Sequence, residues 1–292
     1  MLSGTRFSGI VSHSKPPSRE KEYAFVVASR SHENTTWLNH YFPEWAEYVY
    51  VVDDPNAALT VSVNKGRESM VYLSFIIDNY ENLPELTIFH HALRYQWHND
   101  DPIYDGVAVL RQLQIDYLLS AGYTNLRCVW VIGCPGEFHP LDDEKTLGTT
   151  AEISTGQVYA NAFRELFPGE EVPELVGVSC CAQFSATREK IRERPKSDYV
   201  RYLDWVNSTD LEDYQSGRVL EYSWHMIFGK PPVHCPDAET CYCELFGLCN
   251  ITCDSPSSCE GRYTLPPFST IPEGWPEIGW NGEDTNVSSL YG

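Results

Sequence analysis

Between Tyr23 and His91 the chain alternates three short apolar runs with two amphipathic segments, and this alternation constrains the fold more than any other feature. The apolar runs have the length of buried strands and lie at 23–28, 48–52 and 86–89. The segments between them predict helices over 35–45 and from about 67 to 83, the second with apolar residues at i, i+3 and i+7 spacing. The order strand, helix, strand, helix, strand predicts a right-handed, doubly wound α/β fold around a mostly parallel sheet.

The same patterns continue after the third strand, with less regular spacing. Further helices are expected over 107–121, 153–167, 190–206 and 217–228, and further strands over 126–132 and 176–184. We expect three regions: a disordered leader at 1–22, an α/β domain at 23–233, and a cysteine-rich, Pro/Gly-rich extension at 234–292 that packs on it.

The net charge of −20, from 41 acidic and 21 basic residues, limits the partners of the chain. This charge repels phosphate backbones and anionic lipids, so we expect no nucleic-acid partner and no direct membrane binding. The net charge does not exclude a small molecule or one nucleotide as substrate, because either needs only a local basic patch.

Ten cysteines, six of them between Cys235 and Cys259, and four N-x-[ST] sequons favour an oxidising compartment. The sequons lie at Asn34, Asn207, Asn250 and Asn286. The cysteine spacing lacks the paired C-x2-C units of zinc sites, so disulfides are favoured, with 15 pairings open for the six clustered cysteines. We expect the secretory lumen or the extracellular space. Because residues 1–22 show no signal peptide, the alternative is a cytoplasmic protein with chance sequons.

A dense group of polar residues follows the strand at 86–89, and it is the first candidate for a functional site. His90 and His91 end the strand, and only one of them can face a pocket; we favour His91 because it is nearest the strand end. The loop behind them supplies Arg94, Tyr95, Trp97, His98, Asp100 and Asp101. Polar residues at the carboxyl end of a strand build sites in open α/β sheets, whereas the alternative is a solvated loop.

Two other segments can contribute to binding. Asp53 and Asp54 follow the second strand and can accept hydrogen bonds from a ligand, or they can cap their own turn. Asn64, Lys65 and Arg67 open a helix, where backbone amides and two cations can hold a phosphate; the alternative is an ordinary charged helix start.

Glu221 and His225 have i, i+4 spacing in the last predicted helix, with Trp224 beside them, so they share a face and can line one pocket. The alternative is a structural histidine. His91, with His98, Asp100 and Asp101, can bind Zn²⁺ or Mn²⁺, or serve without a metal as acid and base. Cys180 and Cys181, in an apolar run, are expected to be core residues or disulfide partners.

Several segments, among them YVVDDPNA, TIFHHALRYQWHNDDP and GRVLEYSWHMIFGK, closely resemble a fungal family of uncharacterised proteins over residues 23–250. More distantly, FVVAS, YVYVVDD and the N-x-G before a helix are similar to the nucleotide-sugar half of GT-A glycosyltransferases. That resemblance implies a nucleoside contact at Asp53 or Asp54 and a Mn²⁺-binding Asp-x-Asp at the end of the third strand. The chain has Phe89-His90-His91 there instead. It also implies a C-terminal histidine ligand, for which His225 is the candidate beside His91 and His98.

These observations lead to three hypotheses. In the first, the chain transfers a sugar from a nucleotide sugar: Asn64, Lys65 and Arg67 meet the phosphates, and His91 with Asp100 or Asp101 replaces the metal site or acts as base. In the second, it is a cofactor-independent cyclase, pericyclase or isomerase of fungal natural-product biosynthesis. Tyr95, Trp97 and Trp224 would then shape an apolar cavity in which His91 or Arg94 polarises the substrate. In the third, it is a secreted, non-enzymatic binding module.

Overall fold

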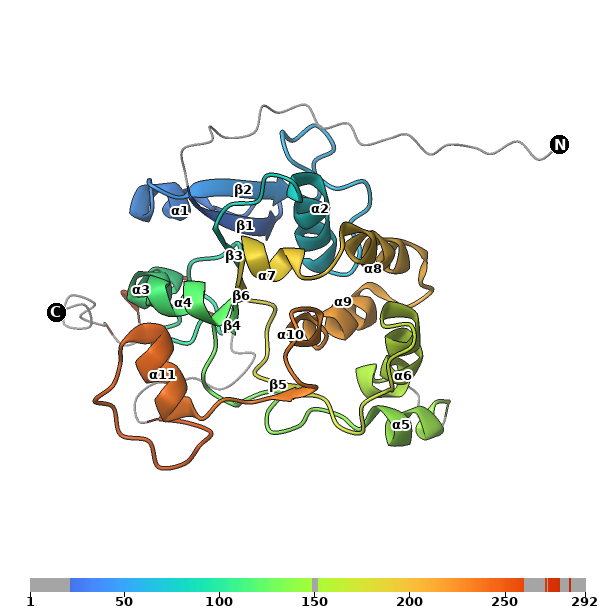
Figure 1. Cartoon of the computed structure of the whole chain (residues 1–292). Coiled ribbons are helices and arrows are strands. Elements are labelled where there is room, and N and C mark those ends of the chain that lie inside the picture. The colour runs from blue at the N-terminus through green and yellow to red at the C-terminus, as the bar shows by residue number, and fades with distance from the viewer. Residues whose placement is uncertain (1–21, 149–151, 260–270, 272, 279–283, 285–292) are drawn as a thin grey trace.

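A five-stranded, mostly parallel sheet forms the centre of the computed structural model, which describes residues 22–148, 152–259, 271, 273–278 and 284 (Figure 1). The strand order is β2 (Ala46–Val51), β1 (Tyr23–Ser29), β3 (Leu86–His91), β6 (Phe184–Thr187) and β4 (Tyr123–Asn125). β1 pairs in parallel with β2 and β3, whereas β6 is antiparallel to both β3 and β4. The predicted α/β class is therefore confirmed. The predicted leader falls almost wholly outside the described residues.

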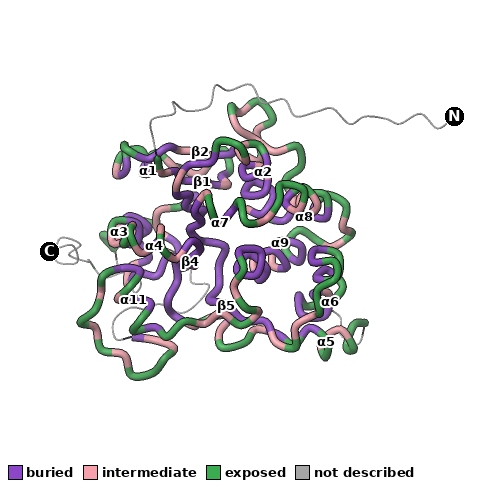
Figure 2. Tube along the Cα trace, viewed as in Figure 1, coloured by how far each residue is buried: buried purple, intermediate pink, exposed green. Residues whose placement is uncertain are grey.

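Helices cover both faces of the sheet, because successive side chains of a strand point to opposite faces. Ala24 and Val26 of β1 belong to one hydrophobic core, and Phe25 and Val27 belong to the other. The first core is closed by α2 (Ser69–Asn79), α6 (Thr155–Leu166), α7 (Arg188–Arg192), α8 (Lys196–Ser208), α9 (Asp213–Glu221) and α10 (Trp224–Ile227). The second is closed by α1 (Thr36–Tyr41), α3 (Gly106–Gln112), α4 (Ile115–Ala121) and α11 (Ala238–Phe246). Figure 2 shows the buried strands between the two groups.

Several helices that the sequence pattern predicts as continuous are broken in the structure. The segment at 107–121 is divided into α3 and α4 at Leu113, whose backbone is extended (ψ 126°). The segment at 190–206 is divided into α7 and α8 around Pro195. The segment at 217–228 belongs to α9 and α10. Apolar periodicity continues through each break, so the sequence pattern alone does not predict where one helix ends and the next begins.

The two later strand predictions are wrong in position. Residues 126–132 form no strand, although Leu126 and Val129 are buried, because the backbone N–H groups of Cys128 and Val129 donate to the Asp100 carboxylate instead of a strand. Of the run at 176–184, Gly177–Val178 forms β5, which pairs with β7 (Val233–His234) in a separate small sheet. β6 begins only at Phe184.

All ten cysteines are paired, which indicates an oxidising environment, secretory or extracellular. Two of the bridges join the cysteine-rich extension to the α/β domain: Cys128–Cys241 and Cys134–Cys235. The others are Cys180–Cys181, Cys243–Cys249 and Cys253–Cys259. None of the helices in the described part of the chain combines the length and hydropathy of a membrane span. The remaining short elements are α5 (Pro140–Asp143) and η1 (Glu144–Thr146).

We expect the two kinds of bridge to differ in their contribution to stability. Cys128–Cys241 closes a loop with a sequence separation of 113, whereas Cys253–Cys259 spans a separation of 6. Loop-closure entropy then gives about 5 kcal/mol for the first bridge and about 2 kcal/mol for the second. Calorimetry of Cys128→Ala/Cys241→Ala and of the matched control Cys253→Ala/Cys259→Ala, without reductant, measures both losses. Equal losses would contradict this assignment of the long-range bridge.

Candidate functional site

A cleft of about 550 Å³ opens beyond the carboxyl ends of β1 and β3. The chain passes from β1 to β2 on one side and then returns to β3 on the other, so the strand order reverses between β1 and β3. Ligands of open α/β sheets bind at such a switch point. The lining residues are Ala28, Ser29, Arg30, Glu33, Val52, Asn64, Arg67, Glu68, His91, Ala92, Leu93, Gln96, His98, Cys181, Ala182, Asp213, Tyr214 and Glu221.

Arg67 is held in the cleft by two glycines. Gly66 and Arg67 both have positive φ, 69° and 53°, which turns the chain sharply just before α2. A Cβ on Gly66 would lie 2.8 Å from a methyl group of Val206, and a Cβ on Gly217 would lie 2.9 Å from Cγ of Arg67. The Arg67 N–H donates to Asp213 across 3.3 Å. The turn and the close approach of α9 therefore fix the start of the Arg67 side chain.

Two carboxyl groups, Glu68 and Glu221, lie in the same cleft. Burial, and then the charge of Glu221, raise the pKa of Glu68 to about 8. Burial also raises the pKa of Glu221, whose Oε1 accepts a hydrogen bond from the Cys181 N–H at 3.1 Å. A carboxyl group with a pKa of about 8, as in Glu68, exchanges protons near neutral pH, as general acids and bases do.

Of the two histidines that end β3, His91 lines the cleft, as predicted, and His90 is fully buried. Nδ1 of His91 lies 3.1 Å from Nδ1 of His98, and its Nε2 lies 4.0 Å from Oε2 of Glu68. Burial lowers the pKa of His91 to about 3 and that of His98 well below its usual range. Both rings are therefore neutral at pH 7.

The structure brings together five of the residues predicted from the sequence: His91, His98, Asn64, Arg67 and Glu221. The others do not line the cleft; they are Asp53, Asp54, Lys65, Arg94, Tyr95, Trp97, Asp100, Asp101, Trp224 and His225.

The loop after β3 is folded inward, and its charged groups hold its backbone. Arg94 forms two hydrogen bonds with Asp105, at 2.7 and 2.8 Å. The Asp100 carboxylate accepts from Tyr242 Oη at 2.7 Å as well as from the N–H groups of residues 128 and 129. Asp101 accepts from the Ile103 N–H. Asp100 is fully buried and Asp101 nearly so. Both carboxylates therefore hold the backbone of the loop, and neither lines the cleft.

Of the predicted residues after β2, Asp53, Asp54 and Lys65 form hydrogen bonds within the domain and do not line the cleft. Asp54 accepts from the Asn56 N–H, as in the turn that was the alternative prediction. Asp53 instead accepts hydrogen bonds from the backbone and hydroxyl of Ser31, which lies after β1. Lys65 donates to the carbonyl oxygen of Thr209.

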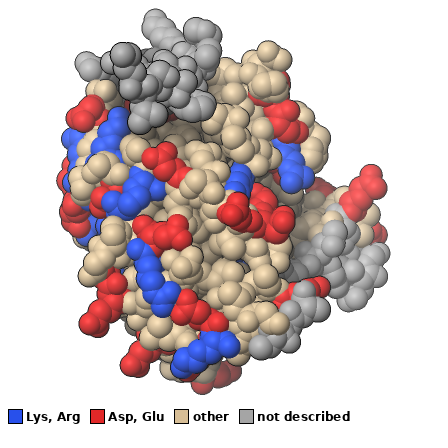
Figure 3. All heavy atoms as spheres, turned by 90° about the vertical axis from the view of Figure 1, so that its right-hand side faces the viewer, with Lys and Arg blue, Asp and Glu red and all other residues tan. Residues whose placement is uncertain are grey.

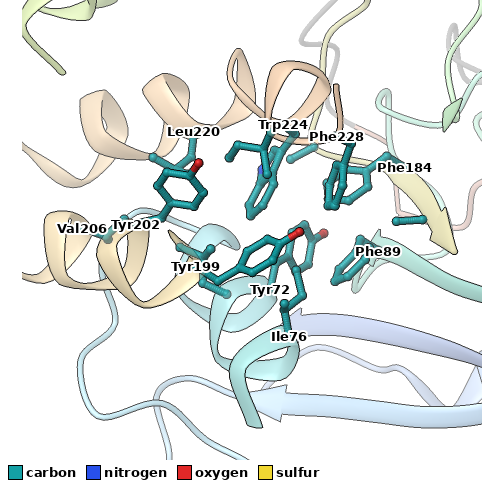
Figure 4. Close-up of a cluster of buried hydrophobic side chains, with 14 of the residues drawn as sticks. Tyr72, Ile76, Phe89, Phe184, Tyr199, Tyr202, Val206, Leu220, Trp224 and Phe228 are labelled. Atoms are coloured by element: carbon teal, nitrogen blue, oxygen red, sulfur yellow. The ribbon is translucent and has the colours of Figure 1, made fainter. Parts of the chain in front are cut away.

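Glu221 and His225 do not share a helical face, because α9 ends at Glu221 and α10 begins at Trp224. The prediction that they line one pocket is therefore wrong. His225 is fully buried, with Nε2 3.0 Å from the carbonyl oxygen of Pro232. Trp224 lies in the aromatic core beside Phe184 and Phe228 (Figure 4).

The Mn²⁺ site implied by the distant resemblance does not fit these residues. His90, at the position of a metal-binding carboxylate, directs Nδ1 to the carbonyl oxygen of His91 at 2.8 Å. His225 is committed elsewhere, and the described residues contain no group of three or more His, Cys, Asp or Glu that could hold a metal ion.

Sequence reasoning missed Arg30, Glu33, Glu68, Gln96 and Asp213, which also line the cleft. Arg30 directly follows the first strand, and Glu68 directly follows Arg67. The end of a strand and a charged helix start were the signals that could have identified them. Asp213 comes from α9, whose approach to α2 has no local sequence signature.

A family model described as "Protein of unknown function (DUF3431)" matches residues 25–244, which is more than half of the chain. Searches of curated proteins and of solved structures found no match.

We expect Glu68→Gln to stabilise the protein increasingly as pH rises. The pKa of Glu68 is about 8 in the folded chain against 4.5 ordinarily, so the folded state binds more protons between these values and loses stability as pH rises through them. Gln cannot ionise, and the gain reaches an upper limit of about 5 kcal/mol above pH 8. Thermal melts of both proteins between pH 5 and about 9 measure it. The matched control is the exposed Glu239→Gln; a gain for Glu68→Gln that is independent of pH would refute the raised pKa.

Proposed function

The chain belongs to the DUF3431 family of proteins of unknown function, and we propose that it is an enzyme that transfers a sugar from a nucleotide sugar to a hydroxyl group of a small acceptor or glycan. One observation carries this proposal. The cleft at the switch point of the sheet combines arginine side chains with a carboxyl group whose pKa lies near neutral pH. Nucleotides and other ligands bind at this place in open α/β sheets.

The cations of the cleft support a phosphate-bearing donor. Arg30 and Arg67 line it together with the amide of Asn64, in a chain whose net charge is −20. A guanidinium group pairs with phosphate oxygens through two parallel hydrogen bonds. On the face drawn in Figure 3, Lys and Arg side chains are interspersed with Asp and Glu and gather into no basic area. Two arginines in one cleft suit one diphosphate, whereas a polynucleotide needs cations along the length of its backbone.

In this proposal Glu68 is the proton acceptor. Its ionised carboxylate removes the proton from the acceptor hydroxyl while that oxygen forms a bond to the anomeric carbon of the donor sugar. The bond from this carbon to the phosphate oxygen breaks, and the leaving nucleoside diphosphate takes the electron pair. Arg30 and Arg67 stabilise the negative charge that develops on it.

The polar lining favours this reading over the cyclase. Twelve of the eighteen lining residues are polar or charged, whereas a pericyclase cavity would be lined mostly by apolar side chains. Tyr95, Trp97 and Trp224, which would shape such a cavity, do not line the cleft. The loop after β3 is also folded against the domain and not splayed in solvent, so the non-enzymatic binding module gains no support from it.

We expect Arg67→Ala to weaken binding of the donor. Isothermal titration with UDP-, GDP- and dTDP-sugars, each with and without Mn²⁺, should give heat with at least one of them. Loss of a charged hydrogen-bond donor costs about 1.5–3 kcal/mol, or about 10- to 150-fold in Kd. Arg164→Ala is the matched control, because Arg164 pairs with Glu144 outside the cleft and should leave Kd unchanged. Absence of heat with every donor would end the proposal.

Once a donor is known, we expect Glu68→Gln to lower kcat by about 10²- to 10⁴-fold, the usual worth of a general base. In the parent enzyme kcat/KM should rise with pH through about 8, since the carboxylate is the active form. Product formation from the sugar donor, followed by chromatography across this range, measures both effects. A rate that falls as Glu68 ionises would contradict its role as base.

A further inference from the structure

A closed series of hydrogen bonds begins at the backbone N–H of His91 and returns to the ring of the same residue. It passes through the side chains of Gln183, Gln96 and His98. Gln183 and Gln96 are 2% and 9% exposed, so water does not compete freely for these groups. Buried polar networks adopt the arrangement that satisfies their members. The orientation of each side chain can therefore be deduced in turn.

Backbone groups fix the orientation of the Gln183 amide. The His91 N–H can only donate, and it lies 3.3 Å from Oε1 of Gln183. Nε2 of Gln183 then faces the carbonyl oxygen of His98 at 3.4 Å and Oδ1 of Asn99 at 3.2 Å. Asn99 is itself fixed, because its Nδ2 donates to the carbonyl oxygens of Arg94 and Tyr104. A reversed Gln183 would place its NH₂ group against the His91 N–H and its oxygen against the acceptor oxygens of His98 and Asn99.

The orientation of Gln183 determines that of Gln96. Oε1 of Gln183 accepts from Nε2 of Gln96 at 3.3 Å. Oε1 of Gln96 therefore points the other way, to Nδ1 of His98 at 3.2 Å. An amide oxygen carries no proton, so the proton of this contact belongs to Nδ1 of His98.

The same His98 N–H faces Nδ1 of His91 at 3.1 Å, so Nδ1 of His91 is the acceptor. A neutral imidazole has one N–H group, which in His91 must be on Nε2. This Nε2 is buried without a hydrogen-bond partner and lies 4.0 Å from Oε2 of Glu68. Hydrogen bonds of catalytic groups are often long in unliganded proteins and shorten when substrate binds.

We infer that Gln183 is a positioning residue, which through Gln96 and His98 holds His91 in the Nε2–H tautomer so that this N–H faces the carboxyl group of Glu68. In this arrangement the Nε2–H of His91 is a donor aimed at Oε2 of Glu68, 4.0 Å away, and His91 does not act as a base. The donor stabilises Glu68 in its ionised form, opposing the burial and the charge of Glu221 that favour the protonated form. The opposite tautomer would face Glu68 with a lone pair. The inference rests on the proposed function only in the use of Glu68 as proton acceptor.

The tautomer can be measured without any substrate. In the intact protein with ¹⁵N-labelled histidine, NMR correlation spectra at pH 7 distinguish a protonated ring nitrogen from a bare one, and the His91→Gln variant identifies the signals of His91. We expect His91 to show a protonated Nε2 and a bare Nδ1, and His98 to show a protonated Nδ1. A protonated Nδ1 on His91 in the parent protein would overturn the inference.

Variants test whether Gln183 sets this state. Gln183→Leu removes the amide that fixes Gln96, so the two His91 signals should move toward the average of both tautomers. Gln183→Glu keeps an acceptor for the His91 N–H and for Gln96, and it should retain the Nε2–H form. Gln157→Leu removes a glutamine that is 4% exposed in α6 and should change stability without changing the His91 signals. Unchanged His91 signals in Gln183→Leu would also refute the inference.

If Gln183→Leu does not fold, Gln96→Leu tests the same relay one step later and should have the same effect on His91. The outcome is separate from that of the proposed function. Absence of nucleotide-sugar binding together with a protonated Nε2 on His91 would remove the function and leave the network. Where a donor binds and reacts, Gln183→Leu should move the rise of kcat/KM to higher pH, because Glu68 would lose its donor.

Discussion

β1 hydrogen-bonds to a parallel neighbour on each side, and the position of the cleft depends on this pairing. Because β2 and β3 lie on opposite sides of β1, the connections leave the sheet in opposite directions, and a cleft opens where they diverge. The alternating side chains of β1 anchor one core on each face, so the strand cannot slide by one residue without exchanging them. The ends of β1 and β3, and with them Arg30 and His91, are thereby held at one edge of the sheet.

The carboxylates around this edge have two distinct uses. Asp100 accepts several hydrogen bonds from backbone and hydroxyl donors and joins the loop after β3 to residues 128–129 and to α11. Glu68 and Glu221 are partly buried with few donors, and the pKa values of both are raised. The difference follows from hydrogen bonding. Donors stabilise the ionised form of a carboxyl group, whereas burial with few donors favours the protonated form and raises the pKa.

Two disulfides join the cysteine-rich extension to the α/β domain, one of them beside Asp100. Cys128–Cys241 ties α11 to the segment that Asp100 already holds, and Cys134–Cys235 fixes the beginning of the extension. Cys180–Cys181 lies just before β6, where the Cys181 N–H donates to Glu221 and Cys181 lines the cleft. Cys128–Cys241 therefore reinforces the segment that Asp100 holds, and Cys180–Cys181 lies where the chain contacts Glu221 in the cleft.

The sequence by itself determined the first three strands and the helices between them, it favoured an oxidising environment, and it identified His91 as the histidine that lines the cleft. Each of these has a local signal in apolar period or residue type. Tertiary structure alone decided which polar residues meet. Asp100 and Glu68 read alike as loop carboxylates near a strand or helix end, yet backbone donors from distant residues reach only the first. Glu221 and His225 match helical spacing, and a turn at residues 222–223 separates them. Gln183 stands 92 residues from His91, and only the pairing of β3 with β6 brings the two together.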